Sequence, residues 1–141
     1  MGDIFYNKTV TVYNRTVEGL MEKETWYPTV LKDIRLLITK GENVSKSGME
    51  SADSAKLFIK TDKLSKEYKK PLEWQNLSAE DKAKTFTLTS GVDFFVEGDT
   101  TAEVPTESDF FSYMKEKYDN CFKVTNADVF ELIPHLEVGG R

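Results

Sequence analysis

Cysteine and histidine are almost absent from this sequence, which holds one of each, Cys121 and His135. A lone cysteine excludes an intramolecular disulfide and leaves no pair of cysteines at metal-ligand spacing. These two residues are therefore the one Cys/His combination available for nucleophilic catalysis. Because Cys121 stands beside Phe122 at the start of a predicted strand, where small buried side chains are common, we expect a structural thiol rather than a nucleophile.

Long apolar runs are also missing, since Asn7, Lys8 and Arg15 interrupt the first hydrophobic segment. We therefore expect neither a signal-peptide core nor a membrane span. No glycine pair opens a helix, which argues against a loop that cradles phosphate. The 19 basic residues are scattered among 24 acidic ones in a chain of net charge −5, so sequence-specific binding of nucleic acid is not expected.

What the sequence does contain is a series of short segments with strand character. Residues 8–14 alternate valine with threonine and tyrosine, and residues 54–60 alternate apolar side chains with lysine. Residues 26–38 supply one long strand or two shorter ones, with Pro28 expected at a sheet edge or a bulge. Further strands are predicted at residues 85–89 and 92–98, joined as a hairpin through Ser90-Gly91. The last strands are predicted from residue 121, with a turn at Asn126, and from residue 135, followed by a glycine tail.

One good helix is predicted near residues 106–119, after Pro105. Thr106 is a suitable N-cap, and Lys115 and Lys117 fall in the last turn, where the helix dipole favours cations. Its apolar residues share one side at helical spacing, so that side is expected to pack on a sheet. They are Phe110, Phe111, Met114 and Tyr118.

These segments predict a single β-rich domain over residues 1–141, with long loops near 40–53 and 61–84. Six to eight short strands and one helix favour a small antiparallel β-barrel or sandwich with the helix laid on it, because short strands protect their edges by closing or stacking. The second loop contains the helix-start signal Ser78-Ala79-Glu80-Asp81, which predicts a short helical turn.

Several groups of residues are candidates for chemical sites. Four carboxylates fall close together in sequence and could gather around a hard cation, but a solvent-facing edge explains them better. They are Asp93, Glu97, Asp99 and Glu103. A lysine cluster at Lys63, Lys66, Lys69 and Lys70 fits a solvated loop or a protein-docking arm better than a nucleic-acid strip. Tyr68 and Trp74 in the same loop are either an exposed binding hot spot or residues that fold back on the core.

The order of several short segments resembles a family of small virion proteins of tailed phages and prophages of Gram-positive bacteria. The segments are KTVTVYN (8–14), W-x-x-T-V-L-K (26–32), G-x-N-V-x-K-S-G (41–48) with ADS (52–54), KKPLEWQ (69–75), FTLTSGVDFFVEGD (86–99), EKYDNCFKVTNAD (116–128) and HLEVGGR (135–141). Each is a strand or a turn, so their shared order and spacing carry the resemblance.

The resemblance implies a structural protein of the head-to-tail joining region, with a stopper, head-closure or minor capsid role at the portal vertex. It implies portal, connector and tail-completion proteins as partners, and a homo-oligomeric ring in the virion formed by a monomer or weak oligomer. The protein would reside in the host cytoplasm during assembly and then at the head-tail junction. No catalytic residue, cofactor or metal ion is expected, and a membrane is not expected as a partner.

On this interpretation the two long loops are assembly segments. The candidate assembly residues are Asn43, Lys46, Ser47, Ser51, Asp53, Tyr68 and Trp74. The alternative is a non-enzymatic β-barrel that binds a small ligand or a peptide, with the loop of Tyr68 and Trp74 as a lid.

Overall fold

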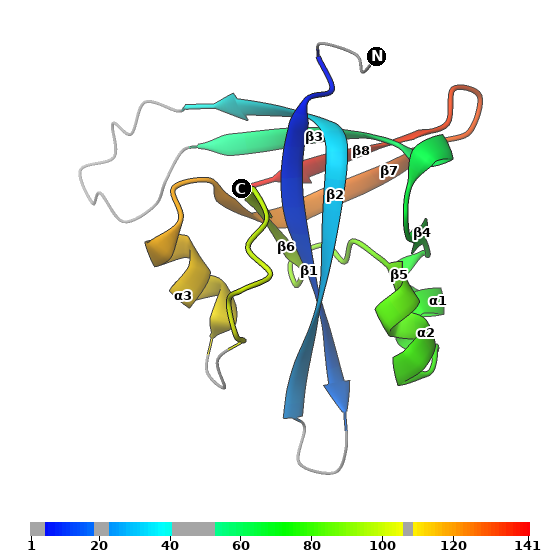
Figure 1. Cartoon of the computed structure of the whole chain (residues 1–141), viewed down its shortest axis with the longest axis vertical. Helices are drawn as coiled ribbons and strands as arrows, with labels where there is room; N and C mark the ends of the chain where they lie inside the picture. Colours follow the sequence, from blue (N-terminus) through cyan, green and yellow to red (C-terminus); the bar gives the residue numbers. More distant parts are fainter. Residues whose placement is uncertain (1–4, 19–22, 41–52, 106–108) are drawn as a thin grey trace.

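The computed structural model describes residues 5–18, 23–40, 53–105 and 109–141, and its centre is a closed barrel of antiparallel strands (Figure 1). The barrel strands are β1 (Lys8–Glu18), β2 (Lys23–Thr39), β3 (Ser54–Lys60), β6 (Phe94–Glu97), β7 (Cys121–Phe130) and β8 (His135–Gly140). Around the barrel they follow the order β1-β2-β3-β8-β7-β6. The predicted mainly β fold with a small antiparallel barrel is confirmed, and closure decides between barrel and sandwich.

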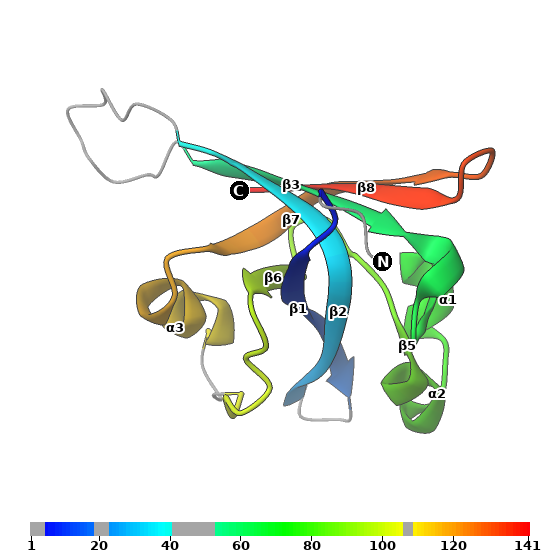
Figure 2. The same ribbon diagram turned by 45° about the horizontal axis from the view of Figure 1, so that its top comes forward.

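The remaining elements lie outside the barrel. They are η1 (Thr61–Lys63), β4 (Glu67–Tyr68), α1 (Pro71–Gln75), α2 (Ala79–Lys84), β5 (Thr85–Phe86) and α3 (Phe110–Lys117). In Figures 1 and 2, α1 and α2 lie on one side of the barrel and α3 lies on the other. Strands β4 and β5 form a separate parallel pair.

The barrel interior is filled by the apolar side chains that alternate along the strands. In β3, Ala55, Leu57 and Ile59 point into the core, whereas Lys56 and Lys60 do not. This alternation is the one predicted, because successive side chains of a strand point to opposite faces. β1 likewise buries Val10 and Val12. The core that these side chains share with β2, β6, β7 and β8 also includes Phe86 and Leu88 from the segment after α2.

A second apolar cluster joins α3 to the outside of the barrel. Phe110 and Met114 of α3 are fully buried against Tyr13, Phe94 and Cys121. The rings of Tyr13 and Phe94 stack with 4.9 Å between centroids. The predicted apolar side of the helix therefore packs on the sheet, and Lys115 and Lys117 stand in the last turn, as expected.

The start of α3 differs from the prediction. The N-cap is Asp109, whose carboxylate accepts a hydrogen bond from the Ser112 backbone N–H, and the helix begins at Phe110. Thr106, the predicted cap, lies outside the described residues. Both are good N-cap residues, and the buried position of Phe110 accompanies a helix start three residues later than a Thr106 cap predicts.

The predicted hairpin between residues 85–89 and 92–98 is wrong. β5 is two residues long and pairs with β4, whereas β6 lies between β1 and β7. Residues 89–93 form a turn in which the backbone N–H groups of Val92 and Asp93 donate to the Thr89 carbonyl. The carboxylate of Asp93 also accepts from the Thr89 N–H, which ends the strand before it could pair with β6.

Two features predicted near the C-terminal strands are also corrected. Asn126 lies in a register shift within β7 and not in a turn, so the strand continues to Phe130. Gly139 and Gly140 belong to β8 and not to a tail, and they pair with β3 and β7. Pro28 lies in the part of β2 that pairs with β1 alone, which is an edge position, and the bulge of β2 lies near Asp33 (φ 56°).

Candidate functional site

Cys121 and His135 lie far apart, because Cys121 is in β7 and His135 in β8 pairs with the opposite end of β7. Cys121 opens the strand, and His135 pairs with Phe130 at its other end, nine residues away, or roughly 30 Å at the rise of a strand. Burial raises the pKa of the Cys121 thiol to about 12, with Lys115 a weaker opposing influence. The thiol is therefore protonated, has no imidazole beside it and packs under α3.

The four carboxylates considered for a cation do not converge on one point. Glu97 lies near Lys8 and accepts from Asn120, and Asp99 accepts from Thr101. Glu103 accepts from Lys117 at 2.6 Å and from the hydroxyl of Tyr118 at 2.8 Å, so it ties α3 to the preceding segment. Among the described residues no group of three or more His, Cys, Asp or Glu side chains could hold a metal ion.

Asp93 is the exception, because it is fully buried and not on a solvent-facing edge. Its carboxylate accepts from the backbone N–H of Arg15 at 3.0 Å, from the Thr89 N–H at 2.8 Å and from the Asn14 amide at 2.9 Å. Burial raises its pKa, and the hydrogen bonds from Arg15, Thr89 and Asn14 oppose that shift. Because all three donors come from β1 and the turn, Asp93 fixes the turn to the barrel.

The predicted loop at 61–84 is a packed lobe. Trp74 is fully buried, and its ring meets Tyr27 edge-on with 5.5 Å between centroids. Tyr68 is half-buried against Phe86, and burial raises its pKa. Of the two interpretations of this aromatic pair, packing onto the core is the one that the structure shows.

Polar contacts also bind this lobe to the barrel. Gln75 donates to the Arg15 carbonyl at 3.0 Å, and the buried Lys82 donates to the Thr16 hydroxyl at 3.2 Å. Lys66 donates to the Pro28 carbonyl, while Lys69 pairs with glutamates of the lobe itself. The lysines whose side chains are described thus do not form one continuous strip.

Most of the predicted assembly residues fall on the other loop. Asn43, Lys46, Ser47 and Ser51 lie outside the described residues. Asp53 stands at the end of that segment, where its carboxylate is 3.1 Å from the Lys40 ammonium. Their assembly role remains a prediction.

The clearest candidate site is one that the sequence analysis missed, the turn between β7 and β8. The exposed fractions of Leu132 and Ile133 are 100% and 77%, and the neighbouring Val129 and Phe130 are also exposed. We refer to residues 129–133 as the hairpin tip. Figure 2 shows this hairpin projecting beyond the rest of the barrel.

The hairpin tip is held in place from its base. The His135 imidazole contacts the Ile133 carbonyl through Nδ1 at 2.6 Å and the Glu137 carboxylate through Nε2 at 3.0 Å. The Thr61 N–H donates to the Pro134 carbonyl, which anchors the turn to η1. The apolar side chains are therefore presented on an anchored support. A signal was available in the sequence, because Leu-Ile directly before Pro134 puts apolar residues where a turn normally carries polar ones.

Comparison with known protein families gives one match. The model of a family of unknown function, DUF6751, matches residues 5–141. No curated protein and no solved structure matches the chain. Among the described residues, no helix has the length and apolar character needed to cross a membrane.

Proposed function

The chain belongs to DUF6751, and we propose that it is a non-enzymatic assembly protein whose hairpin tip docks into a neighbouring protein subunit. The observation that carries the proposal is the contiguous exposure of Val129, Phe130, Leu132 and Ile133. Other exposed apolar residues, such as Leu72 and Val104, lie apart from one another in sequence, and scattered ones are ordinary on a protein surface. A projecting group of four neighbouring apolar side chains is typical of a surface that a partner covers.

The size of the hairpin tip sets the strength of the contact. Fully burying a Leu or Ile side chain contributes about 1.5–3 kcal/mol, so the two most exposed residues together offer about 3–6 kcal/mol. That gross gain must offset the loss of translational and rotational freedom on association. A single tip therefore gives a weak contact, which suits a subunit that is monomeric or weakly oligomeric alone and is held in a larger ring.

The resemblance to phage and prophage virion proteins supplies the setting of this proposal. The assembly is the head-to-tail joining region, the role is head closure, stopper or minor capsid protein, and the neighbours are portal, connector and tail-completion proteins. The protein would assemble in the host cytoplasm and remain at the head-tail junction of the virion. Its net charge of −5 fits a channel through which DNA slides without adhering, because like charges repel.

The test is to replace Leu132 and Ile133 with serine in the genome that encodes the protein. We expect DNA-filled heads without tails to accumulate in electron micrographs, while the purified variant keeps the wild-type Tm because both side chains are exposed. The control is Leu72→Ser, which removes an equally apolar side chain with an exposed fraction of 82% and should leave particle yield unchanged.

Two results would overturn the proposal. One is a normal yield of infectious particles from the Leu132→Ser/Ile133→Ser variant. The other is a purified protein that turns over a substrate or binds a specific DNA sequence tightly.

A further inference from the structure

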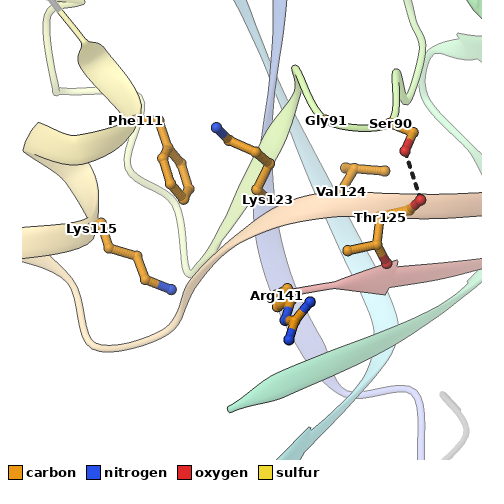
Figure 3. Close-up of a pocket in the computed structure, with 8 residues that line it drawn as sticks. All are labelled: Ser90, Gly91, Phe111, Lys115, Lys123, Val124, Thr125 and Arg141. Carbon is orange, nitrogen blue, oxygen red and sulfur yellow. Dashed lines mark hydrogen bonds between the residues drawn. The ribbon is translucent and has the colours of Figure 1, made fainter. Parts of the chain in front are cut away.

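A cleft lies at the other end of β7 from the hairpin tip, and its lining suits a protein group that docks into it. It has a volume of about 570 Å³, and its lining includes Phe111, Lys115, Lys123, Val124 and Arg141 (Figure 3). Three of the eight lining residues carry cationic side chains, and none of the eight is Asp or Glu.

Two of the cations are placed directly opposite each other. The Lys123 N–H donates to the Arg141 carbonyl at 3.0 Å, and the Arg141 N–H donates to the Lys123 carbonyl at 2.9 Å. Residues that exchange both backbone hydrogen bonds lie directly opposite each other on neighbouring strands. In Figure 3 the Lys123 side chain extends toward Phe111, and the Arg141 side chain extends away from it. Among the described residues, neither side chain forms an ion pair, although the charge of Lys123 contributes to lowering the pKa of the Asp109 carboxyl, after the hydrogen bonds from Ser112. An anion bound at the cleft would meet positive charge from both residues.

A third cation, Lys115, and the ring of Phe111 complete the lining of the cleft. The Lys115 ammonium donates to the Cys121 carbonyl at 2.7 Å and reaches the cleft from α3. The Lys123 ammonium lies 4.5 Å from the centre of the Phe111 ring, so charge stands over an apolar surface. The side of the cleft is fixed by the Ser90 hydroxyl, which donates to the Thr125 carbonyl at 2.7 Å (Figure 3). Such a cleft fits an apolar group that carries a carboxylate.

The hairpin tip has this composition, because exposed Glu131 stands directly before Leu132 and Ile133. Among the described residues, Glu131 has no ion pair. The tip cannot reach the cleft of its own molecule, since Phe130 and Lys123 are seven residues apart along β7, or roughly 23 Å. We infer that the hairpin tip of one copy docks into the cleft of a second copy, with Glu131 facing Lys123 and Arg141. This inference rests on the proposed function and names the partner.

The arrangement fixes the type of assembly. Because the contact joins different surfaces of two copies, it is head-to-tail, and repetition gives a ring if the rotation closes. A ring subunit needs an acceptor as well as a projecting group, and the two ends of β7 supply them. Each interface then combines apolar burial with attraction between one carboxylate and two cations.

A mixing experiment tests the inference by sedimentation velocity. One variant, Leu132→Ser/Ile133→Ser, keeps the cleft and loses the tip. The other, Lys123→Glu/Arg141→Glu, keeps the tip and reverses the charge of the cleft. We expect wild-type protein to self-associate at high concentration, each variant alone to associate at least about tenfold more weakly, a change equivalent to 1.4 kcal/mol, and the mixture to give one-to-one dimers that grow no further.

Two controls make the result specific. Lys32→Glu/Lys70→Glu changes the net charge equally on exposed lysines outside the cleft and should leave self-association unchanged. Adding Glu131→Arg to the charge-reversed cleft variant should restore self-association, because the ion pair is then inverted.

The inference is overturned if wild-type protein stays monomeric at every concentration, or if the mixture forms no dimer. The proposed function survives either result when the tip variant still fails to make tailed particles, since the tip then docks into a different protein. A normal yield of particles from the tip variant would overturn both the inference and the proposed function.

Discussion

The imidazole of His135 lies flat against the ring of Phe130, with 4.7 Å between centroids and 5° between planes. These residues form the last pair of the β7–β8 ladder, so the stack closes the hairpin just before its tip. The same imidazole contacts the Ile133 carbonyl and the Glu137 carboxylate. When protonated, it donates from both nitrogens, whereas the neutral ring donates from one.

The pKa of His135 is expected to lie above 6.5. The hydrogen bond to Glu137 raises it, and the hydrogen bond to Ile133 adds to that effect. Because these hydrogen bonds favour the protonated imidazole in the folded state, His135 contributes to the free energy of unfolding. That contribution is fully present below pH 6.5 and is lost as pH rises through the raised pKa. An NMR titration of the single histidine measures it, and Glu137→Gln should lower the pKa. A wild-type value at or below 6.5 would contradict the hydrogen-bonding described.

The Cys121 thiol should resist modification in the native protein. It is fully buried, and its pKa is raised to about 12, so very little thiolate is present at neutral pH. Reaction with a thiol reagent should be slow in buffer and fast in denaturant, where the barrel is open. Rapid labelling of one thiol per chain in native buffer would show that α3 leaves the barrel easily.

Removing the carboxylate of Asp93 should destabilise the barrel. Asp93→Ala leaves two backbone N–H groups and one N–H of the Asn14 amide without their acceptor, while the other N–H of that amide keeps the Thr87 carbonyl. Each buried unsatisfied group costs about 1–3 kcal/mol. We expect the free energy of unfolding in urea to fall by more than about 2 kcal/mol. Asp99→Ala, at an exposed carboxylate that accepts hydrogen bonds from Thr101, should change it by less than about 0.5 kcal/mol. Equal effects of the two substitutions would contradict this role.

Gly140 should tolerate no side chain. A Cβ there would lie 2.6 Å from Cζ of Phe95 and 2.9 Å from Cβ of Phe122. Overpacking of this kind costs about 1–3 kcal/mol, so Gly140→Ala should lower the free energy of unfolding by that amount. In the Gly140→Ala/Phe95→Leu double variant the loss should be smaller than the sum of the single losses, because the smaller side chain vacates the space. Strict additivity would show that the two positions do not touch.

The sequence predicts the regular parts of this fold well, and particular residues show why. In β3 the alternation of Leu57 and Ile59 with Lys56 and Lys60 matches the period of a strand, so local information suffices. Ser78 likewise caps α2 through a bond to the Asp81 N–H, which a helix-start signal predicts. These features depend on neighbours in sequence.

The failures depend on contacts between distant residues. Asp93 looks like a surface carboxylate until Asn14, 79 residues away, is placed beside it. β5 leaves its predicted partner because β4 offers an edge and because β6 is taken by β1 and β7. The sequence predicts a strand at Val129 but does not show which of its side chains are exposed. The closed barrel shows that Val129 and the residues of the hairpin tip after it face outward. The cleft of Lys115, Lys123 and Arg141 likewise gathers residues from α3, β7 and the end of β8.

The place of β8 in the barrel also bears on how the protein is made. β8 follows every other strand in the chain, yet it fills the gap between β3 and β7. As the polypeptide leaves the ribosome, those two strands each expose a row of unpaired backbone groups until β8 emerges, and such edges invite aggregation. A chain that ends before residue 135 would therefore leave two sheet edges open to pairing with another chain.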